Sequence, residues 1–219
     1  MTNKTIRVLI ACLTLTALIC FTPGCGIHQD PAQPVTYYQL NYPPPEVAFQ
    51  ADRLPFVIRV EPFQPSELYS RQGLVYQKGK YLSARYAYHQ WITPLERMIP
   101  RFIARDLRHA DIVRSVFLNG GEAATHRVVG SIEAFYEEDR EDQWTAVVSI
   151  SITLIDTGTR PIVEQICFQK LYNSRKICQE KTPGAFVAAA SQAMSDVSRK
   201  LTADIYEILV KTAPSDRPE

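Results

Sequence analysis

The stretch from Leu74 to Leu107, LVYQKGKYLSARYAYHQWITPLERMIPRFIARDL, carries signals for a hairpin, an aromatic strand and a helix. Its first part contains two short apolar runs around Lys78-Gly79, a spacing typical of a tight turn between paired strands. The next part is rich in aromatic residues, which favour strands because they fit a pleated, half-buried surface. These residues are Tyr81, Tyr86, Tyr88 and Trp91. The stretch therefore predicts two paired strands followed by a helix.

The helix in this stretch is expected to begin at Thr93. Thr93 is a typical N-cap, Pro94 suits the first helical position, and Glu96 follows as the capping-box partner. Apolar residues then recur at intervals of three and four, which predicts one buried helical face. They are Leu95, Ile99, Phe102, Ile103 and Leu107. Because a proline inside a helix removes a hydrogen bond, Pro100 predicts a bent or two-part helix.

Three long strands are expected after this helix. Residues 126–137 and 143–156 alternate between apolar and other side chains, as in a sheet with one buried and one exposed face. Residues 137–142, EEDRED, are expected to form a solvated hairpin tip rather than a cation site. Residues 162–172 are expected to return as the third strand.

A second long helix is expected from about Pro183 to Val210, with Thr182 as its cap. Its apolar stripe indicates packing against the sheet. Two main helices and a mostly antiparallel or mixed sheet of five to seven strands predict an α+β fold, with both helices on one face of the sheet.

Residues 1–24 have the organisation of a secretory signal peptide, with Lys4 and Arg7 ahead of an apolar centre and a small-residue exit. Cys25 follows directly, and this arrangement resembles a bacterial lipobox, in which the cysteine is acylated. Thr22 stands where the lipobox usually has Leu. The alternative is an ordinary signal peptide with an incidental cysteine. Two or more acyl chains would hold the protein stably on a membrane surface without spanning it.

The chain therefore divides into four expected parts. Residues 1–24 form the signal peptide, and residues 25–46 form a proline-rich tether that begins at the acylated cysteine. Residues 47–210 form the folded domain, and residues 211–219 form a disordered tail. Within the tether, residues 36–40 have the composition of a strand.

Several function classes find no support in the sequence. The 219 residues carry a formal net charge of +1, which provides no electrostatic case for nucleic-acid binding. None of the four histidines has a second histidine or a cysteine at metal-ligand spacing. Serine nucleophile elbows and phosphate-binding glycine loops are also missing from the sequence. We therefore expect no catalytic residues, no metal site and no cofactor.

Two groups of residues each have two interpretations. Cys167 and Cys178 flank a turn-like sequence, Asn173 to Lys176, and an exported chain meets an oxidising compartment. The cysteines either form a disulfide worth roughly 2–3 kcal/mol or remain two unpaired, buried thiols. The aromatic group either belongs to the core and the sheet surface or forms a contact surface for a lipid or partner. Its members are Tyr81, Tyr86, Tyr88 and Trp91.

The order of these features resembles the ABC-type transport auxiliary lipoproteins, the PqiC-like family. The resemblance covers about Tyr37 to Leu209 and includes YYxL from Tyr37, IRVxPF from Ile58 and VVGSIExF from Val128. Its most specific part is Tyr86-Ala87-Tyr88-His89-Gln90-Trp91, followed by Pro94.

This resemblance implies a non-enzymatic accessory role beside MCE-domain proteins and ABC permeases, which carry phospholipid or other lipids between the two membranes of diderm bacteria. By resemblance to enterobacterial sorting, Gly26 after Cys25 favours the periplasmic face of the outer membrane over the inner membrane. A homo-oligomer is compatible with such partners. The alternatives are a structural or pilotin-like lipoprotein of another envelope machine and, with less support, an envelope enzyme.

Overall fold

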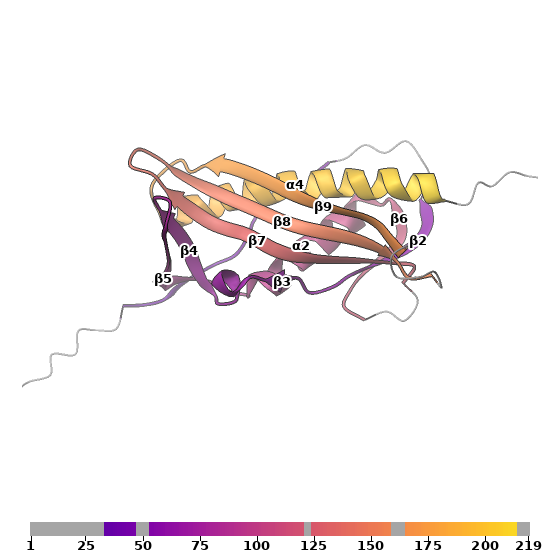
Figure 1. The fold of residues 1–219 in the computed structure, drawn as a ribbon, viewed down its shortest axis with the longest axis horizontal. Coiled ribbons are helices and arrows are strands. Elements are labelled where there is room, and N and C mark those ends of the chain that lie inside the picture. Colours follow the sequence, from indigo (N-terminus) through magenta and orange to yellow (C-terminus); the bar gives the residue numbers. More distant parts are fainter. Residues whose placement is uncertain (1–32, 47–52, 121–123, 159–164, 214–219) are drawn as a thin grey trace, which may run out of the picture. The chain divides into compact units, whose positions relative to one another are not determined.

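The computed structural model describes residues 33–46, 53–120, 124–158 and 165–213. The chain separates into two compact units, Met1–Pro34 and Val35–Glu219. Nearly all described residues belong to the second unit, whose elements are shown in Figure 1. In chain order, they are β1 (Thr36–Tyr38), β2 (Leu54–Val60), β3 (Gln64–Pro65), the 3-10 helix η1 (Glu67–Tyr69), β4 (Gly73–Lys78), β5 (Leu82–Trp91), α2 (Leu95–Ala110), β6 (Val113–Leu118), β7 (His126–Asp139), β8 (Trp144–Asp156), β9 (Ile166–Ile177) and α4 (Pro183–Thr212).

The long strand β7 organises the sheet. One edge of β7 pairs antiparallel with β8, and β8 pairs antiparallel with β9. The other edge of β7 pairs with β2, β3 and β4 in succession, all in parallel. Beyond these, β4 continues antiparallel to β5 and then to the parallel β1, whereas β2 continues to the parallel β6. The prediction of an α+β fold with a mixed sheet is confirmed. The described strands number nine, which exceeds the predicted five to seven. The excess comes from β1 and β3, which have only three and two residues.

Both main helices lie on the same side of the sheet, behind β7, β8 and β9 in the view of Figure 1. The alternation predicted for β8 is confirmed by side chains with at most 1 % exposure, which are Ala146, Val148, Ile150, Ile152 and Leu154. The predicted stripe on α4 faces them, and its fully buried members are Phe186, Ala190, Ala193, Val197, Leu201 and Ile205. Thr182 caps α4 as predicted, since its side chain accepts a hydrogen bond from the Ala185 N–H. Each large apolar side chain buried here stabilises the fold by about 1.5–3 kcal/mol.

A bulge in β7 changes which side chains face the core. The pairing with β8 shifts between Ile132 and Ala134, so that one extra residue is accommodated. Because strand side chains alternate, this insertion turns Phe135 inward, at 1 % exposure, in place of Ala134. It also turns Glu137 inward, at 0 % exposure. The expectation that Glu137 belongs to a solvated hairpin tip is therefore wrong.

Helix α2 differs from its prediction at its start and around its proline. The helix begins at Leu95 with Pro94 as N-cap and has no capping side chain, so Thr93 does not form the predicted capping box. Pro100 lies within one continuous helix. Proline has no N–H to bond the carbonyl of Glu96, and the N–H of Phe63 occupies that carbonyl at 3.1 Å. A neighbouring segment thus supplies the missing donor.

The start of the second unit is tied into the fold. β1 pairs with β5, and Leu40 and Tyr42 are 1 % and 6 % exposed. Within the stretch expected to be a tether, residues 35–46 are therefore part of the folded unit, while residues 25–32 lie outside the described part of the chain. Among the described helices, none is long and apolar enough to cross a membrane.

Candidate functional site

The four aromatic residues singled out from the sequence occupy different environments. Trp91 is 1 % exposed and packs edge-on against Phe135, with ring centroids 5.6 Å apart. Tyr86 is half-buried, whereas Tyr88 is 45 % exposed. Tyr81, in the turn before β5, is 88 % exposed. The strand therefore divides these residues between the core and the surface instead of gathering them into one patch.

Tyr86 reaches across β4 to the buried carboxylate of Glu137. Its hydroxyl donates to the two carboxylate oxygens at 3.1 and 3.2 Å. Burial raises the pKa of Glu137 from 4.5 to about 7; the hydrogen bond from Tyr86 opposes this rise, and the nearby Asp139 adds to it. Burial and the adjacent carboxylate also raise the pKa of the Tyr86 phenol. Glu137 is therefore a core carboxyl group that titrates near neutral pH.

The same strand is tied to β1 through His89. The Tyr38 hydroxyl and His89 Nδ1 are 3.0 Å apart, and the His89 ring meets Tyr86 edge-on at 5.5 Å. β5 thus links β1, β7 and the core through three side chains of the YAYHQW sequence. The segment that carries the family resemblance therefore makes contacts that hold the fold together.

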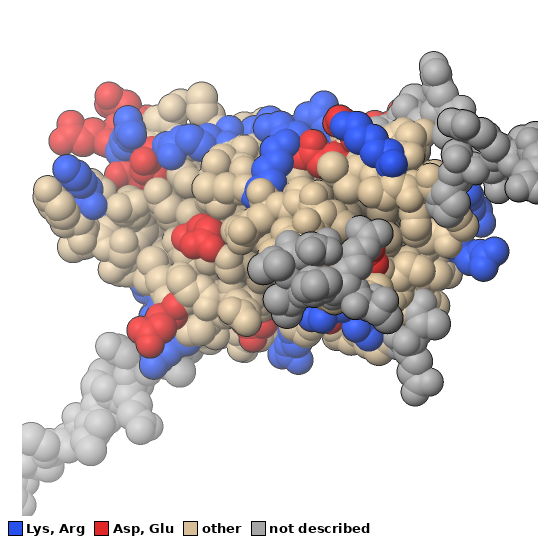
Figure 2. All heavy atoms as spheres, turned by 45° about the vertical axis from the view of Figure 1, so that its right-hand side comes forward, with Lys and Arg blue, Asp and Glu red and all other residues tan. Residues whose placement is uncertain are grey.

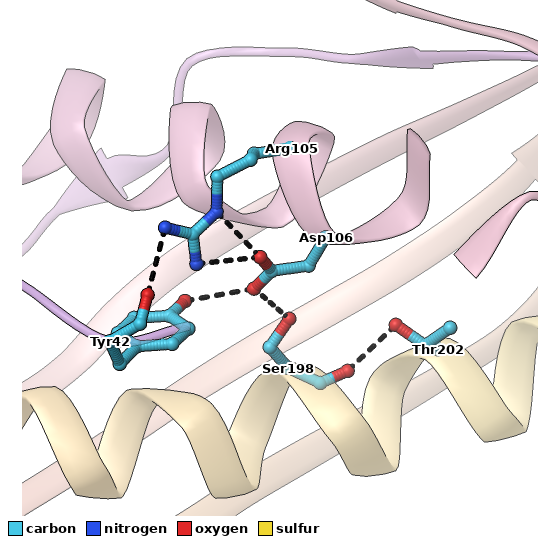
Figure 3. Close-up of polar contacts among 5 residues, drawn as sticks. All are labelled: Tyr42, Arg105, Asp106, Ser198 and Thr202. Carbon is cyan, nitrogen blue, oxygen red and sulfur yellow. Dashed lines mark hydrogen bonds and ion pairs between the residues drawn. The ribbon is translucent and has the colours of Figure 1, made fainter. Parts of the chain in front are cut away.

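A second buried carboxylate, Asp106, lies where α2, α4 and the N-terminal segment meet (Figure 3). It is 1 % exposed, and its Oδ2 accepts from the Tyr42 hydroxyl at 3.0 Å and from the Ser198 hydroxyl at 2.5 Å. Its Oδ1 accepts from Arg105 Nε at 2.8 Å. Arg105 also donates to the Tyr42 carbonyl at 3.0 Å and stacks over the Tyr42 ring at 4.6 Å. The charge of Asp106 is therefore compensated by donors from three separate segments.

Two further contacts extend this cluster along α4. The Thr202 hydroxyl donates to the Ser198 carbonyl at 2.8 Å, as Figure 3 shows. The Ser191 hydroxyl oxygen accepts from the Asn41 N–H at 3.0 Å. The cluster fixes the segment after β1 against both helices, which is a structural task.

The outer face of α2 carries arginines at intervals of four, four and three, namely Arg97, Arg101, Arg105 and Arg108. This spacing places them along one side of the helix. Beside them lie two adjoining hollows of about 450 and 390 Å³, which share the lining residues Ile92, Thr93, Arg101 and Leu118. We call the arginines and these hollows the arginine groove. Because like charges four residues apart cost a helix about 0.2–0.5 kcal/mol per pair, the stripe does not serve helix stability.

This arginine stripe was not predicted from the sequence, in which the apolar face of α2 is the more obvious pattern. The signal was present as the repeat R-x-x-x-R-x-x-x-R-x-x-R from Arg97 to Arg108. The hollows beside it were not accessible to sequence reasoning, because Ile92 and Leu118 belong to segments on either side of the helix.

The fold does not allow the disulfide considered between Cys167 and Cys178. Cys167 is the second residue of β9, and Cys178 follows its last residue. At about 3.3 Å per residue, an extended strand separates them by roughly 36 Å, whereas a disulfide requires Cα atoms about 4.4–6.8 Å apart. The presumed turn from Asn173 to Lys176 is part of the strand. The other candidate cysteine, Cys25, lies outside the described residues.

Charge elsewhere on the surface is mixed. Figure 2 shows basic and acidic side chains together along the upper edge of its view and few charges across the centre. On β9 and α4, Lys170 pairs with Asp204, and Lys176 and Arg199 pair with Asp196. In the part of the chain that the structure describes, no group of three or more His, Cys, Asp or Glu residues is arranged to hold a metal ion.

Comparison with known proteins gives this domain a family. The model of the ABC-type transport auxiliary lipoprotein component family matches residues 38–202. This match covers more than half of the chain, so the protein belongs to that family and is an envelope-associated lipoprotein that serves ABC-type transport. A search of curated proteins found no significant match.

Solved structures that share the fold include the following two. A crystal structure of a Xanthomonas campestris protein superposes with a TM-score of 0.70 at 12 % identity, covering 81 % of this chain and 98 % of that one. A crystal structure of an uncharacterised protein gives a TM-score of 0.63 at 16 % identity, covering 79 % of this chain and 99 % of that one. At these identities the likeness concerns the fold alone.

Proposed function

We propose that this protein is a non-enzymatic accessory subunit of an ABC/MCE-type system that moves phospholipid or another lipid between the inner and outer membranes. The family match over residues 38–202 is the observation that carries this proposal. In this proposal, acylated Cys25 anchors the chain to the periplasmic leaflet of the outer membrane. The folded domain then docks on an MCE-domain protein whose ABC permease lies in the inner membrane.

The start of the folded unit supports an anchored arrangement. Residues after Val35 are held by β1 and by the Asp106 cluster, so a pull on the N-terminal side is transmitted to α2 and α4. The segment from Cys25 to Val35 spans at most about 35 Å when fully extended. An anchor at Cys25 would therefore keep the domain close to the membrane surface.

The anchor is tested by intact mass of the protein extracted from membranes of its native host. We expect a chain that begins at Cys25 and carries two or three acyl groups. Cys25→Ser should abolish both acylation and the cut before residue 25, whereas Cys20→Ser should change neither. A non-acylated chain cut at another position would contradict the anchor.

The partner is tested by crosslinking in living cells followed by affinity purification. We expect the wild-type protein to recover an MCE-domain protein and an ABC permease, and Cys25→Ser to recover less of both. Deletion of the gene should alter lipid composition or membrane integrity. Recovery of components of a different envelope machine, without a lipid phenotype, would support the structural or pilotin-like alternative and overturn this proposal.

A further inference from the structure

We propose that the arginine groove on α2 binds the phosphate headgroup of an anionic phospholipid at a membrane surface. The inference deepens the proposed function and rests on it, because the acyl anchor at Cys25 is what would bring the groove to lipid.

The four arginine side chains differ in how they are engaged by neighbouring residues. Arg97 and Arg101 are exposed, and neither side chain has a hydrogen bond or an ion pair with any described residue. Arg105 is engaged by Asp106, and Arg108 donates to the Val116 carbonyl at 3.1 Å. Two guanidinium groups one helical turn apart are thus available to a ligand. A guanidinium matches phosphate oxygens with paired hydrogen bonds.

Apolar side chains line the groove next to these charges. Ile92 is 57 % exposed, and Met98, Phe102 and Leu118 line the larger hollow beside Arg101. A free phosphate gains nothing from apolar surface, whereas a phospholipid carries apolar acyl chains on the glycerol that bears its phosphate. Charge and apolar surface together therefore favour a lipid headgroup over an inorganic ion.

The groove includes a residue close to the start of the folded unit. Gln39 lines the larger hollow and lies just after β1, at the start of the folded unit. The segment from Cys25 to Gln39 spans at most about 50 Å when fully extended. Membrane lipids are consequently within reach of the groove whenever Cys25 is acylated.

The inference is tested by vesicle co-sedimentation of the mature chain, which begins at residue 25, carrying Cys25→Ser; this chain lacks both the acyl anchor and the apolar signal segment as causes of binding. Vesicles contain either phosphatidylcholine alone or phosphatidylcholine with phosphatidylglycerol. We expect binding to the phosphatidylglycerol vesicles that weakens as salt is raised. Arg97→Gln with Arg101→Gln should reduce this binding by about tenfold or more. Both side chains are exposed, so an unchanged unfolding midpoint verifies that the variant folds.

Arg140→Gln with Arg175→Gln is the matched control, because it removes the same charge from the β7–β8 turn and β9. It should retain binding. Equal loss in both double variants would show a general charge effect and overturn the inference, as would equal binding of the chain carrying Cys25→Ser alone to both kinds of vesicle. Full competition by inorganic phosphate would identify a free-phosphate site, and full competition by polyglutamate an acidic protein partner; each also overturns it.

Partner capture in the crosslinking experiment separates this inference from the proposed function. If MCE and permease components are captured but the protein does not bind vesicles, the lipid-binding inference is overturned and the proposed function stands. Vesicle binding without captured components would remove the proposed function and leave a lipid-binding groove of another envelope protein.

Discussion

The side chains of Asp106 and Glu137 are both buried, at 1 % and 0 % exposure, but different hydrogen-bond donors and cations surround the two carboxylates. Asp106 accepts from two hydroxyls and forms an ion pair with Arg105 at 2.7 Å. The carboxylate of Glu137 accepts a hydrogen bond from the Tyr86 hydroxyl, and no cation among the described residues forms an ion pair with Glu137. The two carboxylates therefore differ in the number and charge of their donors, although both are fully buried.

The largest effect is expected for Asp106→Asn. The substitution removes the charge that compensates Arg105 and disturbs the acceptor of Tyr42 and Ser198, which should lower the free energy of unfolding by about 3 kcal/mol. Urea denaturation measures this loss. As a control, Asp196→Asn removes a partly exposed ion-pair partner and should cost less than about 1 kcal/mol. Equal losses in both variants would remove the distinction between a buried cross-link and a surface ion pair.

The next effect depends on pH. Folded Glu137 keeps its proton up to about pH 7, whereas the unfolded chain releases it near 4.5, so stability falls as pH rises between these values. The full difference between the folded and unfolded pKa of Glu137 corresponds to about 3 kcal/mol in the free energy of unfolding. Glu137→Gln should therefore stabilise the protein at pH 8 and have little effect at pH 4.5 or below.

Urea denaturation across this pH range, with Glu133→Gln as the control, measures the effect. Glu133 is exposed on the same strand and should leave the pH dependence unchanged. A pH dependence that persists in Glu137→Gln would show that Glu137 does not titrate in the folded state as argued.

A smaller effect is expected from removing one hydroxyl at each carboxylate. Tyr86→Phe takes away the donor to Glu137 and should cost about 1–2 kcal/mol at pH 8. Tyr42→Phe leaves Asp106 with Ser198 and Arg105 and should cost about 1 kcal/mol. Thermal or urea unfolding of the two variants under identical conditions compares them. A larger loss of unfolding free energy in Tyr42→Phe than in Tyr86→Phe would contradict this prediction.

The smallest effect is expected at Cys178. Burial, with the nearby charge of Glu137, raises the pKa of its thiol to about 11. Its alkylation at pH 8 should therefore be slow in the folded protein and only modestly faster in Glu137→Gln. Mass spectrometry after timed iodoacetamide treatment follows Cys178, and urea-unfolded protein gives the reference rate. Rapid alkylation in the folded state would contradict its burial.

The elements with regular patterns were predictable, and those shaped by distant partners were not. The alternation of β8 and the stripe of α4 each describe one element against a shared core, and both predictions are confirmed. The start of α2 was misplaced because Pro94, and not Thr93, precedes its first turn. The effect of Pro100 was overestimated because Phe63, from another segment, satisfies the Glu96 carbonyl.

The candidate sites divide in the same way. Local sequence indicated the lipobox-like Cys25, the aromatic strand and the family, since each is carried by neighbouring residues. Local sequence did not indicate that Cys167 and Cys178 lie at opposite ends of one strand. Nor did it reveal that the β7 bulge turns Glu137 inward.

By itself, then, the sequence determined the periodic elements, the α+β class and the family, because hydrophobic periodicity and contiguous motifs are local properties. Only the tertiary structure decided the partners of Asp106 and Glu137 and the hollow beside the arginines. Those properties depend on segments such as Tyr42 and Ser198, which lie far apart in the chain and meet only when the core closes.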